Sequence, residues 1–164
     1  MHKILVTSDS HGSAYALCRV AETEPDAEAM IFLGDGLRDL DGLCQRHPNL
    51  RVYSVRGNCD FSAFEAGEGL AAFGGVLFFY AHGDSYGVKY SRAQLAQAAR
   101  ARGADAALYG HTHTAANEEI EGVTVFNPGS VGRPREGSAS YGVITIQDGK
   151  ANFEHRKVPP LWDD

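Results

Sequence analysis

The side chains best suited to metal chemistry in this chain occur in five short motifs, each placed directly after a predicted strand. Glycine and aspartate are common in turns, and a single histidine is usually a surface residue, so one such motif would mean little. Five in succession indicate a metal centre. The motifs are Asp9-Ser10-His11, Gly34-Asp35-Gly36, Gly57-Asn58-Cys59-Asp60, His82-Gly83-Asp84 and Gly110-His111-Thr112-His113.

The residue types in these motifs favour a transition metal. Asp9 and His11 are separated by one residue, so in an extended segment both side chains project the same way and can chelate one ion. Asp35 supplies a carboxylate whose two oxygens can bridge two cations, and Asn58 supplies a neutral amide oxygen. Further imidazoles, in a set without a thiolate, favour Mn first, with Fe, Ni or Zn as alternatives, over Ca or Mg. These imidazoles belong to His82, His111 and His113.

Charge balance favours two divalent ions in this centre. With neutral imidazoles, the carboxylates of Asp9 and Asp35 offset half of the charge of two such ions, and a bridging hydroxide offsets part of the remainder. The residual positive charge matches a phosphodiester. Two ions about 3.5–4 Å apart would activate the hydroxide, orient the phosphoryl oxygens and stabilise an in-line attack without a protein nucleophile.

The first half of the chain alternates strands and helices. Apolar runs predict strands at residues 3–8, 29–33 and 50–55, and amphipathic patterns predict helices at 14–22 and 37–46 between them. Such alternation predicts a parallel sheet, in which ligands bind at the carboxyl ends of the strands. The first three motifs lie at those ends.

The second half has the pattern of hairpins. Gly74-Gly75 separates predicted strands at 69–73 and 76–81, and a helix at 91–102 precedes a short strand at 106–109. The last two motifs follow strands 76–81 and 106–109. Further strands are predicted at 115–120, 123–127, 141–147 and 152–158, and this tail suggests a second sheet packed on the first.

The motif series resembles that of the calcineurin-like metallophosphoesterases, and among them the small bacterial and archaeal YfcE-type phosphodiesterases. The family pattern DxH, GD, GN, H and GHxH is matched without a gap over nearly the whole chain, and Asn127-Pro128-Gly129-Ser130 resembles a turn of the same subgroup. The resemblance implies an α/β fold, a four-layer αββα sandwich of two mixed sheets. It also implies one metal held by Asp9, His11, Asp35 and His113, and another held by Asp35, Asn58, His82 and His111.

One position departs from the wider family. Many relatives have a histidine after Gly-Asn that is thought to protonate the leaving group, whereas this chain has Cys59 followed by Asp60, as the YfcE-like subgroup does. A thiol is a poor acid near its unperturbed pKa, so leaving-group assistance would come from Asp60, from solvent, or not at all. Cys59 is more simply interpreted as a small buried filler. The expected catalytic residues are Asn58, Asp60 and His82.

Arginines near the motifs are candidates for substrate binding, because a guanidinium group matches phosphate oxygens. Arg56 directly precedes Gly57, and Arg133 follows the Asn-Pro-Gly-Ser turn, so these two rank above Arg135. A role in surface solubility is an equal alternative for each.

Length and composition limit the other possibilities. The 164 residues fit a single domain spanning 1–164, and the apolar runs are too short for a membrane helix. A net charge of −6 without a basic cluster argues against binding of long nucleic acids. Three dispersed cysteines indicate reduced thiols, and the early first motif leaves no space for a signal peptide, so we expect a cytoplasmic protein.

The leading functional hypothesis is a metal-dependent phosphodiesterase that hydrolyses small phosphodiesters. The alternatives are a phosphomonoesterase or nucleotide pyrophosphatase, and a non-catalytic interaction scaffold, since a retromer subunit resembles this fold. A pure scaffold would have no chemical reason to keep His82 and His113. The chain has no large insertion to cap the site, which leaves open completion by a second copy in a homo-oligomer.

Overall fold

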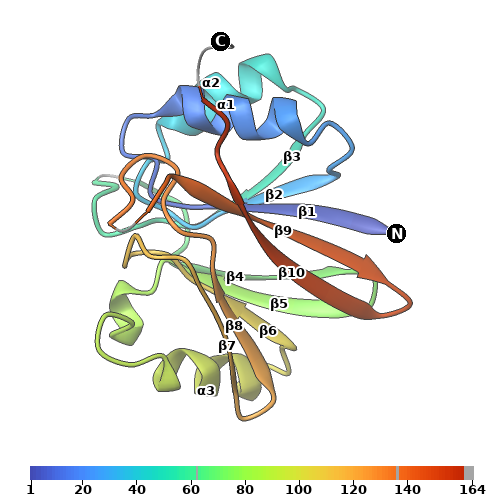
Figure 1. Ribbon diagram of the computed structural model, residues 1–164. Helices are drawn as coiled ribbons and strands as arrows, with labels where there is room; N and C mark the ends of the chain where they lie inside the picture. The colour runs from blue at the N-terminus through green and yellow to red at the C-terminus, as the bar shows by residue number, and fades with distance from the viewer. Residues whose placement is uncertain (62, 136, 161–164) are drawn as a thin grey trace.

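Ten strands in the described part of the chain form two five-stranded sheets. The structure is a computed structural model that describes residues 1–61, 63–135 and 137–160. The first sheet has the order β10-β9-β1-β2-β3 and the second has the order β4-β5-β6-β8-β7. Figure 1 shows both sheets stacked between helices α1 and α2 on one side and helix α3 on the other.

The first sheet contains the predicted strand–helix alternation. Strands β1 (His2–Thr7), β2 (Ala29–Phe32) and β3 (Arg51–Ser54) are parallel, and helices α1 (Ala14–Thr23) and α2 (Asp39–Arg46) connect them. The hairpin of β9 (Ser140–Gln147) and β10 (Lys150–Lys157) completes this sheet, because β9 pairs antiparallel with β1. The expectation that the whole C-terminal tail forms the second sheet was therefore wrong for this hairpin.

The second sheet contains the strands from the middle of the chain together with the β7–β8 hairpin. Strands β5 (Val76–Ala81), β6 (Ala106–Leu108) and β8 (Val123–Asn127) are parallel, and β4 (Glu68–Phe73) and β7 (Ala116–Ile120) pair antiparallel at its two edges. Helix α3 (Ala93–Ala101) precedes β6. A short 3-10 turn, η1 (Asp84–Tyr86), follows the histidine motif after β5 and was not predicted.

Alternation along the strands builds three apolar layers. Ile4 and Val6 of β1 face the second sheet and share a core with Phe78, whereas Leu5 points the other way and packs with Leu17 of α1. On the far side, α3 covers the outer face of the second sheet. The two mixed sheets with their flanking helices confirm the predicted αββα sandwich. No helix of the described residues combines the length and apolar character needed to cross a bilayer.

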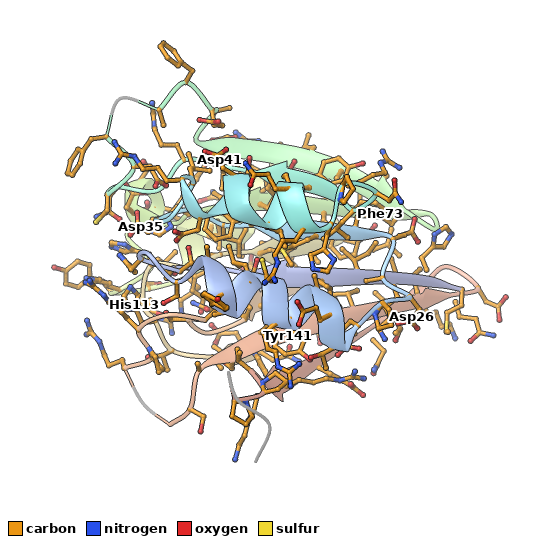
Figure 2. All side chains as sticks on the ribbon, turned by 90° about the horizontal axis from the view of Figure 1, so that it is seen from above. Asp26, Asp35, Asp41, Phe73, His113 and Tyr141 are labelled. Carbon is orange, nitrogen blue, oxygen red and sulfur yellow. The ribbon has the colours of Figure 1, made fainter. Side chains whose placement is uncertain are left out.

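This arrangement brings the motif loops to one end of the molecule. Strands β1, β2 and β3 point the same way in the first sheet, as β5 and β6 do in the second, so the loops that follow them converge. Figure 2 shows Asp35 and His113 at the same end of the sheets, opposite Asp26.

Candidate metal centre

The two aspartates and four histidines predicted as ligands meet between the sheets. Asp9 Oδ1 lies 3.2 Å from His113 Nε2 and 3.7 Å from His11 Nε2. Asp35 Oδ2 lies 3.2 Å from His82 Nε2 and 3.8 Å from His11 Nε2. His82 Nε2 is in turn 3.2 Å from Nδ1 of His111.

Ligand-type atoms in this cluster fall into two main groups. Asp9, His11 and His113 form one, and Asp35, His82 and His111 form the other, with all atoms of a group within 4.8 Å of one another. The grouping coincides with the division that the family resemblance implies. Ligation by these residues stays a prediction, and so does ligation by Asn58, whose exposed amide donates to Cys59 Sγ at 3.5 Å.

A buried oxygen without a hydrogen-bond partner indicates that the cluster fits a cation. Asp9 is fully buried; its Oδ2 accepts from the Ser8 hydroxyl and from the His111 N–H, but Oδ1 has no hydrogen-bond partner among the described residues. An unpaired buried carboxylate oxygen is costly. A metal ion beside Asp9 Oδ1 would satisfy it, and the nearby imidazoles are suitable additional donors.

Hydrogen bonds on the far side of two imidazoles set their orientation. The Nδ1–H of His82 donates to the Leu33 carbonyl, and that of His113 donates to the Arg133 carbonyl, both at 2.7 Å. In this tautomer each Nε2 presents its lone pair to the carboxylates, which is the usual arrangement of metal-binding histidines.

The backbone of the predicted ligands is strained. Among the described residues, seven non-glycine residues have positive φ, a conformation that costs on the order of 1 kcal/mol or more for an L-residue. Two of these, Glu121 and Asp148, precede glycines in hairpin turns. The other five are Asp9 (56°), His11 (43°), Asp35 (61°), His111 (70°) and His113 (60°), so the strain is concentrated at the predicted ligands.

The carboxylates and imidazoles shift one another's pKa values. Burial alone would raise the pKa of Asp35, but the close contact with His82 and the positive charge of its protonated ring outweigh it and lower the pKa to about 2. Burial lowers the pKa of His82, yet Asp35 and Asp9 raise it above its usual value overall. The nearby Asp9 carboxylate raises the pKa of His113, whereas burial and His82 lower that of His111. Asp35 is therefore ionised at neutral pH and attracts cations.

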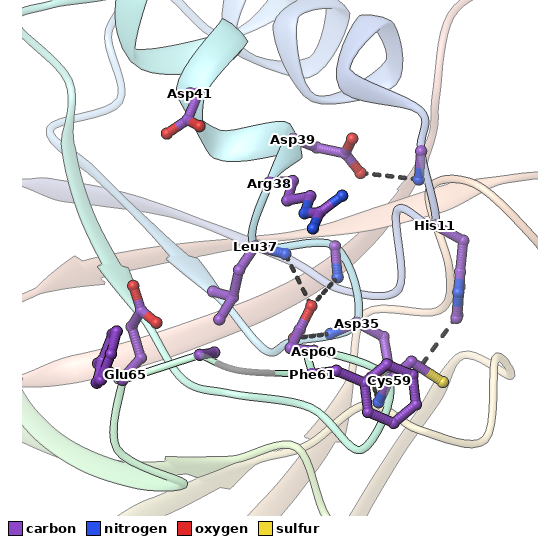
Figure 3. A pocket seen from close by; sticks show the side chains of 14 residues that line it. His11, Asp35, Leu37, Arg38, Asp39, Asp41, Cys59, Asp60, Phe61 and Glu65 are labelled. Atoms are coloured by element: carbon purple, nitrogen blue, oxygen red, sulfur yellow. Dashed lines mark hydrogen bonds and ion pairs between the residues drawn. The ribbon is translucent and has the colours of Figure 1, made fainter.

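Asp60 has a different environment from the one that a proton donor would need. Its carboxylate accepts four backbone N–H groups, from Gly57 in its own loop and from Asp35, Gly36 and Leu37 in the loop after β2, at 2.7–3.1 Å. Figure 3 shows it beneath this second loop. The geometry favours a positioning role, in which Asp60 holds the loop that carries Asp35.

Cys59 is exposed, so its interpretation as a buried filler was wrong. Its backbone N–H donates to Asp35 Oδ1 at 2.7 Å, which places the thiol beside His11 and Asp35. Partial burial and the Asp35 charge raise the pKa of the Cys59 thiol, so the thiol stays protonated at neutral pH.

The two arginines predicted to bind substrate are both exposed. Arg56 lines a hollow of about 290 Å³ together with Asn58 and Ser85. The main chain of Arg133 supports the loop structure, because its carbonyl orients His113 and its N–H donates to Ser130 Oγ at 2.7 Å. Substrate binding by either guanidinium stays a prediction.

A network behind the centre was not foreseen from the sequence. Asn127 Nδ2 donates to the Gly110 carbonyl and to Thr112 Oγ1, and so holds the loop that carries His111 and His113. The carbonyl of Asn127 lies 2.7 Å from Nε2 of His155. His155 is an exposed residue of β10, and its ring also stacks on Phe126 at a centroid distance of 4.5 Å. The Asn-Pro-Gly-Ser turn gave a partial signal in the sequence for the role of Asn127. Nothing in the sequence indicated the contact of His155.

Comparisons with known proteins identify the family of this chain. Residues 2–149 match the model of the calcineurin-like phosphoesterase superfamily domain, and the chain therefore belongs to this superfamily of phosphoric ester hydrolases. It is 34% identical over 151 residues to the probable metallophosphoesterase YsnB of Bacillus subtilis, covering 90% of this chain and 86% of YsnB. It is 31% identical over 171 residues to the phosphodiesterase YfcE of Escherichia coli, covering 88% of each.

Solved structures share the fold. A predicted phosphoesterase from Streptococcus pneumoniae superposes with a TM-score of 0.82 at 25% identity, over 97% of this chain and 93% of the other. Vps29 from Entamoeba histolytica, solved in complex with Zn²⁺, superposes with a TM-score of 0.71 at 20% identity, over 96% and 99%. The second likeness concerns the fold alone.

Proposed function

We propose that this chain is a metal-dependent phosphodiesterase that hydrolyses small phosphodiesters at a binuclear centre. The observation that carries the proposal is the buried Oδ1 of Asp9, which has no hydrogen-bond partner in the described residues and faces the imidazoles of His11 and His113. The superfamily membership and the likeness to a phosphodiesterase, YfcE, support it.

The proposed ligands of the two divalent ions are Asp9, His11, Asp35, Asn58, His82, His111 and His113. Their nitrogen and oxygen donors favour Mn²⁺, with Fe, Ni or Zn as alternatives. Such ions would lower the pKa of a bound water and neutralise charge on phosphoryl oxygens. The chain itself supplies the orientation: the carbonyls of Leu33 and Arg133 fix two imidazoles, and Asp60 fixes the Asp35 loop.

A diester suits the charge of this site better than a monoester. Two carboxylates leave a small positive charge on two ions and a hydroxide, which matches the single negative charge of a diester. With Asp60 occupied by backbone donors and the Cys59 thiol close to Asp35, proton donation to the leaving group falls to solvent. We therefore expect slow turnover of esters with poor leaving groups.

Metal analysis together with hydrolysis tests the proposal. Bis(p-nitrophenyl) phosphate and p-nitrophenyl phosphate are compared with and without Mn²⁺, and we expect metal-dependent turnover with a preference for the diester. Asp9→Asn should lower Mn²⁺ affinity about 100-fold or more. Asp148→Asn is the matched control, because Asp148 has a similar φ of 53° but lies in the β9–β10 turn.

The outcomes separate the competing functions. A preference for the monoester would favour a phosphomonoesterase. Neither bound metal nor turnover in the wild-type protein would favour an interaction scaffold, the role that the likeness of fold to Vps29 leaves as the second candidate. Assembly into a homo-oligomer and a cytoplasmic location stay predictions.

A further inference from the structure

A pocket of about 660 Å³ opens directly on the candidate metal centre. His11 and Asp35 line one side of it, and the start of α2 and the loop after β3 form its walls. Figure 3 shows this pocket. Sites for small molecules commonly measure about 300–1,000 Å³, so the pocket has room for a whole ester group beside the phosphate.

Arg38 supplies a local positive charge in an otherwise acidic pocket, and this charge is available to a ligand. The guanidinium is exposed, and within the described residues no carboxylate pairs with it. Two neighbouring carboxylates are already engaged: Asp39 accepts from Ser10 Oγ and from the Gly12 N–H, and Asp60 accepts four backbone N–H groups. In Figure 3, Arg38 extends from the start of α2 toward the middle of the pocket.

Phe61 gives the same pocket an aromatic face. Its side chain is 84% exposed, which is unusual for phenylalanine, and it lines the pocket together with Cys59 and Asp35 (Figure 3). An exposed ring next to a phosphate site is a stacking surface for a nucleobase. Asp41 and Glu65 also line the pocket, where they can accept hydrogen bonds from sugar hydroxyls but would repel a long polyanion.

We propose that this pocket binds a nucleotide as the ester group beyond the scissile phosphate, with the base on Phe61 and a second phosphate on Arg38. The inference rests on the proposed function and names its substrate class: short phosphodiesters that carry a nucleoside phosphate. A planar ring, hydroxyl groups and one additional phosphate together match the aromatic, acidic and basic side chains that line the pocket.

Calorimetric binding to the Mn²⁺-loaded protein tests this proposal without relying on turnover. The ligands are inorganic phosphate, thymidine 5′-monophosphate and thymidine 3′,5′-bisphosphate. We expect each added group to strengthen binding by about tenfold, because base stacking and a charge-assisted hydrogen bond each stabilise the complex. Arg38→Gln should abolish the advantage of the bisphosphate, and Phe61→Ala should abolish that of the nucleoside.

Matched variants control for charge and surface area. Arg46→Gln removes an exposed guanidinium at the other end of α2, and Tyr90→Ala removes a ring that is 92% exposed elsewhere. Both should keep the wild-type ratios, and Phe61→Tyr should keep the nucleoside advantage. Equal affinities for the three ligands in the wild-type protein, or unchanged ratios in both pocket variants, would overturn the proposal.

A second assay on the same proteins distinguishes failure of the pocket proposal from failure of the proposed function. Hydrolysis of methyl p-nitrophenyl phosphate needs the metal centre but no nucleotide pocket. Turnover of that ester with unchanged binding ratios would leave the phosphodiesterase intact and remove the pocket proposal. If Phe61→Ala instead changed the molecular mass in solution and left the ratios unchanged, Phe61 would belong to an interface between copies of this chain.

Discussion

The Nε2 atoms of His11 and His113 lie 3.2 Å apart, although 102 residues separate them in the chain. Two imidazole nitrogens at this distance repel one another unless a proton or a cation lies between their lone pairs. Asp9 Oδ1 lies close to both nitrogens, so the three atoms surround a position where a cation would be stabilised. A metal ion bound there would therefore compete with a proton for the same place.

This competition predicts that Mn²⁺ binding releases protons. Asp9 and Asp35 raise the pKa values of His82 and His113 above the ordinary 6.5, so these imidazoles still carry protons near that pH in the metal-free protein. Metals bind neutral imidazole, and affinity should rise with pH until the pH exceeds the raised pKa values. Asp35, with a pKa of about 2, stays ionised and adds no pH dependence there.

Calorimetric titrations with Mn²⁺, in buffers that differ in ionisation enthalpy, measure the number of protons released. The His113→Gln variant should release fewer protons when it binds Mn²⁺. The interpretation fails if affinity in the wild-type protein is constant between about pH 5.5 and 8, the range in which histidine titrates.

Asp60→Asn should act on the loop that carries Asp35 and leave the chemistry of the leaving group unchanged. An amide group turns two of the four acceptor contacts into clashes between donors, which should destabilise the protein by about 1–3 kcal/mol and weaken metal binding. At saturating Mn²⁺ the rate should fall by the same factor for diesters of all leaving-group pKa values. A general acid would instead give the largest loss for poor leaving groups, and Asp148→Asn serves again as the control.

The strands and the convergence of the candidate ligands were predictable from the sequence for a physical reason. A strand buried on both faces is a continuous apolar run, and parallel strands must end at one edge, so polar residues after Leu33 or Ala81 converge without knowledge of any contact. The predicted strand boundaries agree with the structure where the apolar runs stop abruptly. Helix α2, which begins at Asp39 and not at Leu37, follows a loop whose shape Asp60 sets.

Features that depend on contacts across the fold were not predictable. The β9–β10 hairpin could pair with either sheet, and only its packing against β1, as in the pair Leu5 and Val143, places it in the first. Likewise Asp60 has the sequence context of a catalytic acid, and its four backbone partners exist only once two loops have folded together. Arg38 belongs to no motif, so its place in the pocket was not visible in the sequence.

Asn127→Ala should lower the metal affinity of the candidate centre, although Asn127 is not a proposed ligand. The variant loses both hydrogen bonds to the loop that carries His111 and His113, and the Gly110 carbonyl keeps the Thr112 N–H as a donor. We expect a loss of about 1–3 kcal/mol in unfolding free energy and about 10–100-fold in Mn²⁺ affinity. Asn152→Ala, at an exposed position of β10, is the control in denaturation and metal titration. Unchanged metal affinity in Asn127→Ala would show that the loop keeps its shape without this residue.

Glu24 should make the fold sensitive to acid. Its buried carboxylate accepts from Lys3 at 2.7 Å, Tyr141 at 2.6 Å and Arg156 at 2.8 Å. Burial alone would raise the pKa of Glu24, but these bonds outweigh it and hold the pKa below the ordinary 4.5. A lowered pKa stabilises the folded state above about pH 4.5, and that contribution is lost as the pH falls through the lower value.

Glu24→Gln should therefore lose about 1–3 kcal/mol at pH 7, and the difference from the wild-type protein should shrink as the pH falls below about 4. Urea denaturation of the metal-free proteins at both pH values measures it. Glu22→Gln, at an exposed position two residues earlier in α1, should change stability by less than about 0.5 kcal/mol at either pH. A Glu24→Gln deficit that stays constant down to acid pH would mean that the loss comes from packing and not from the charge, because only the ionised carboxylate gains from the lowered pKa.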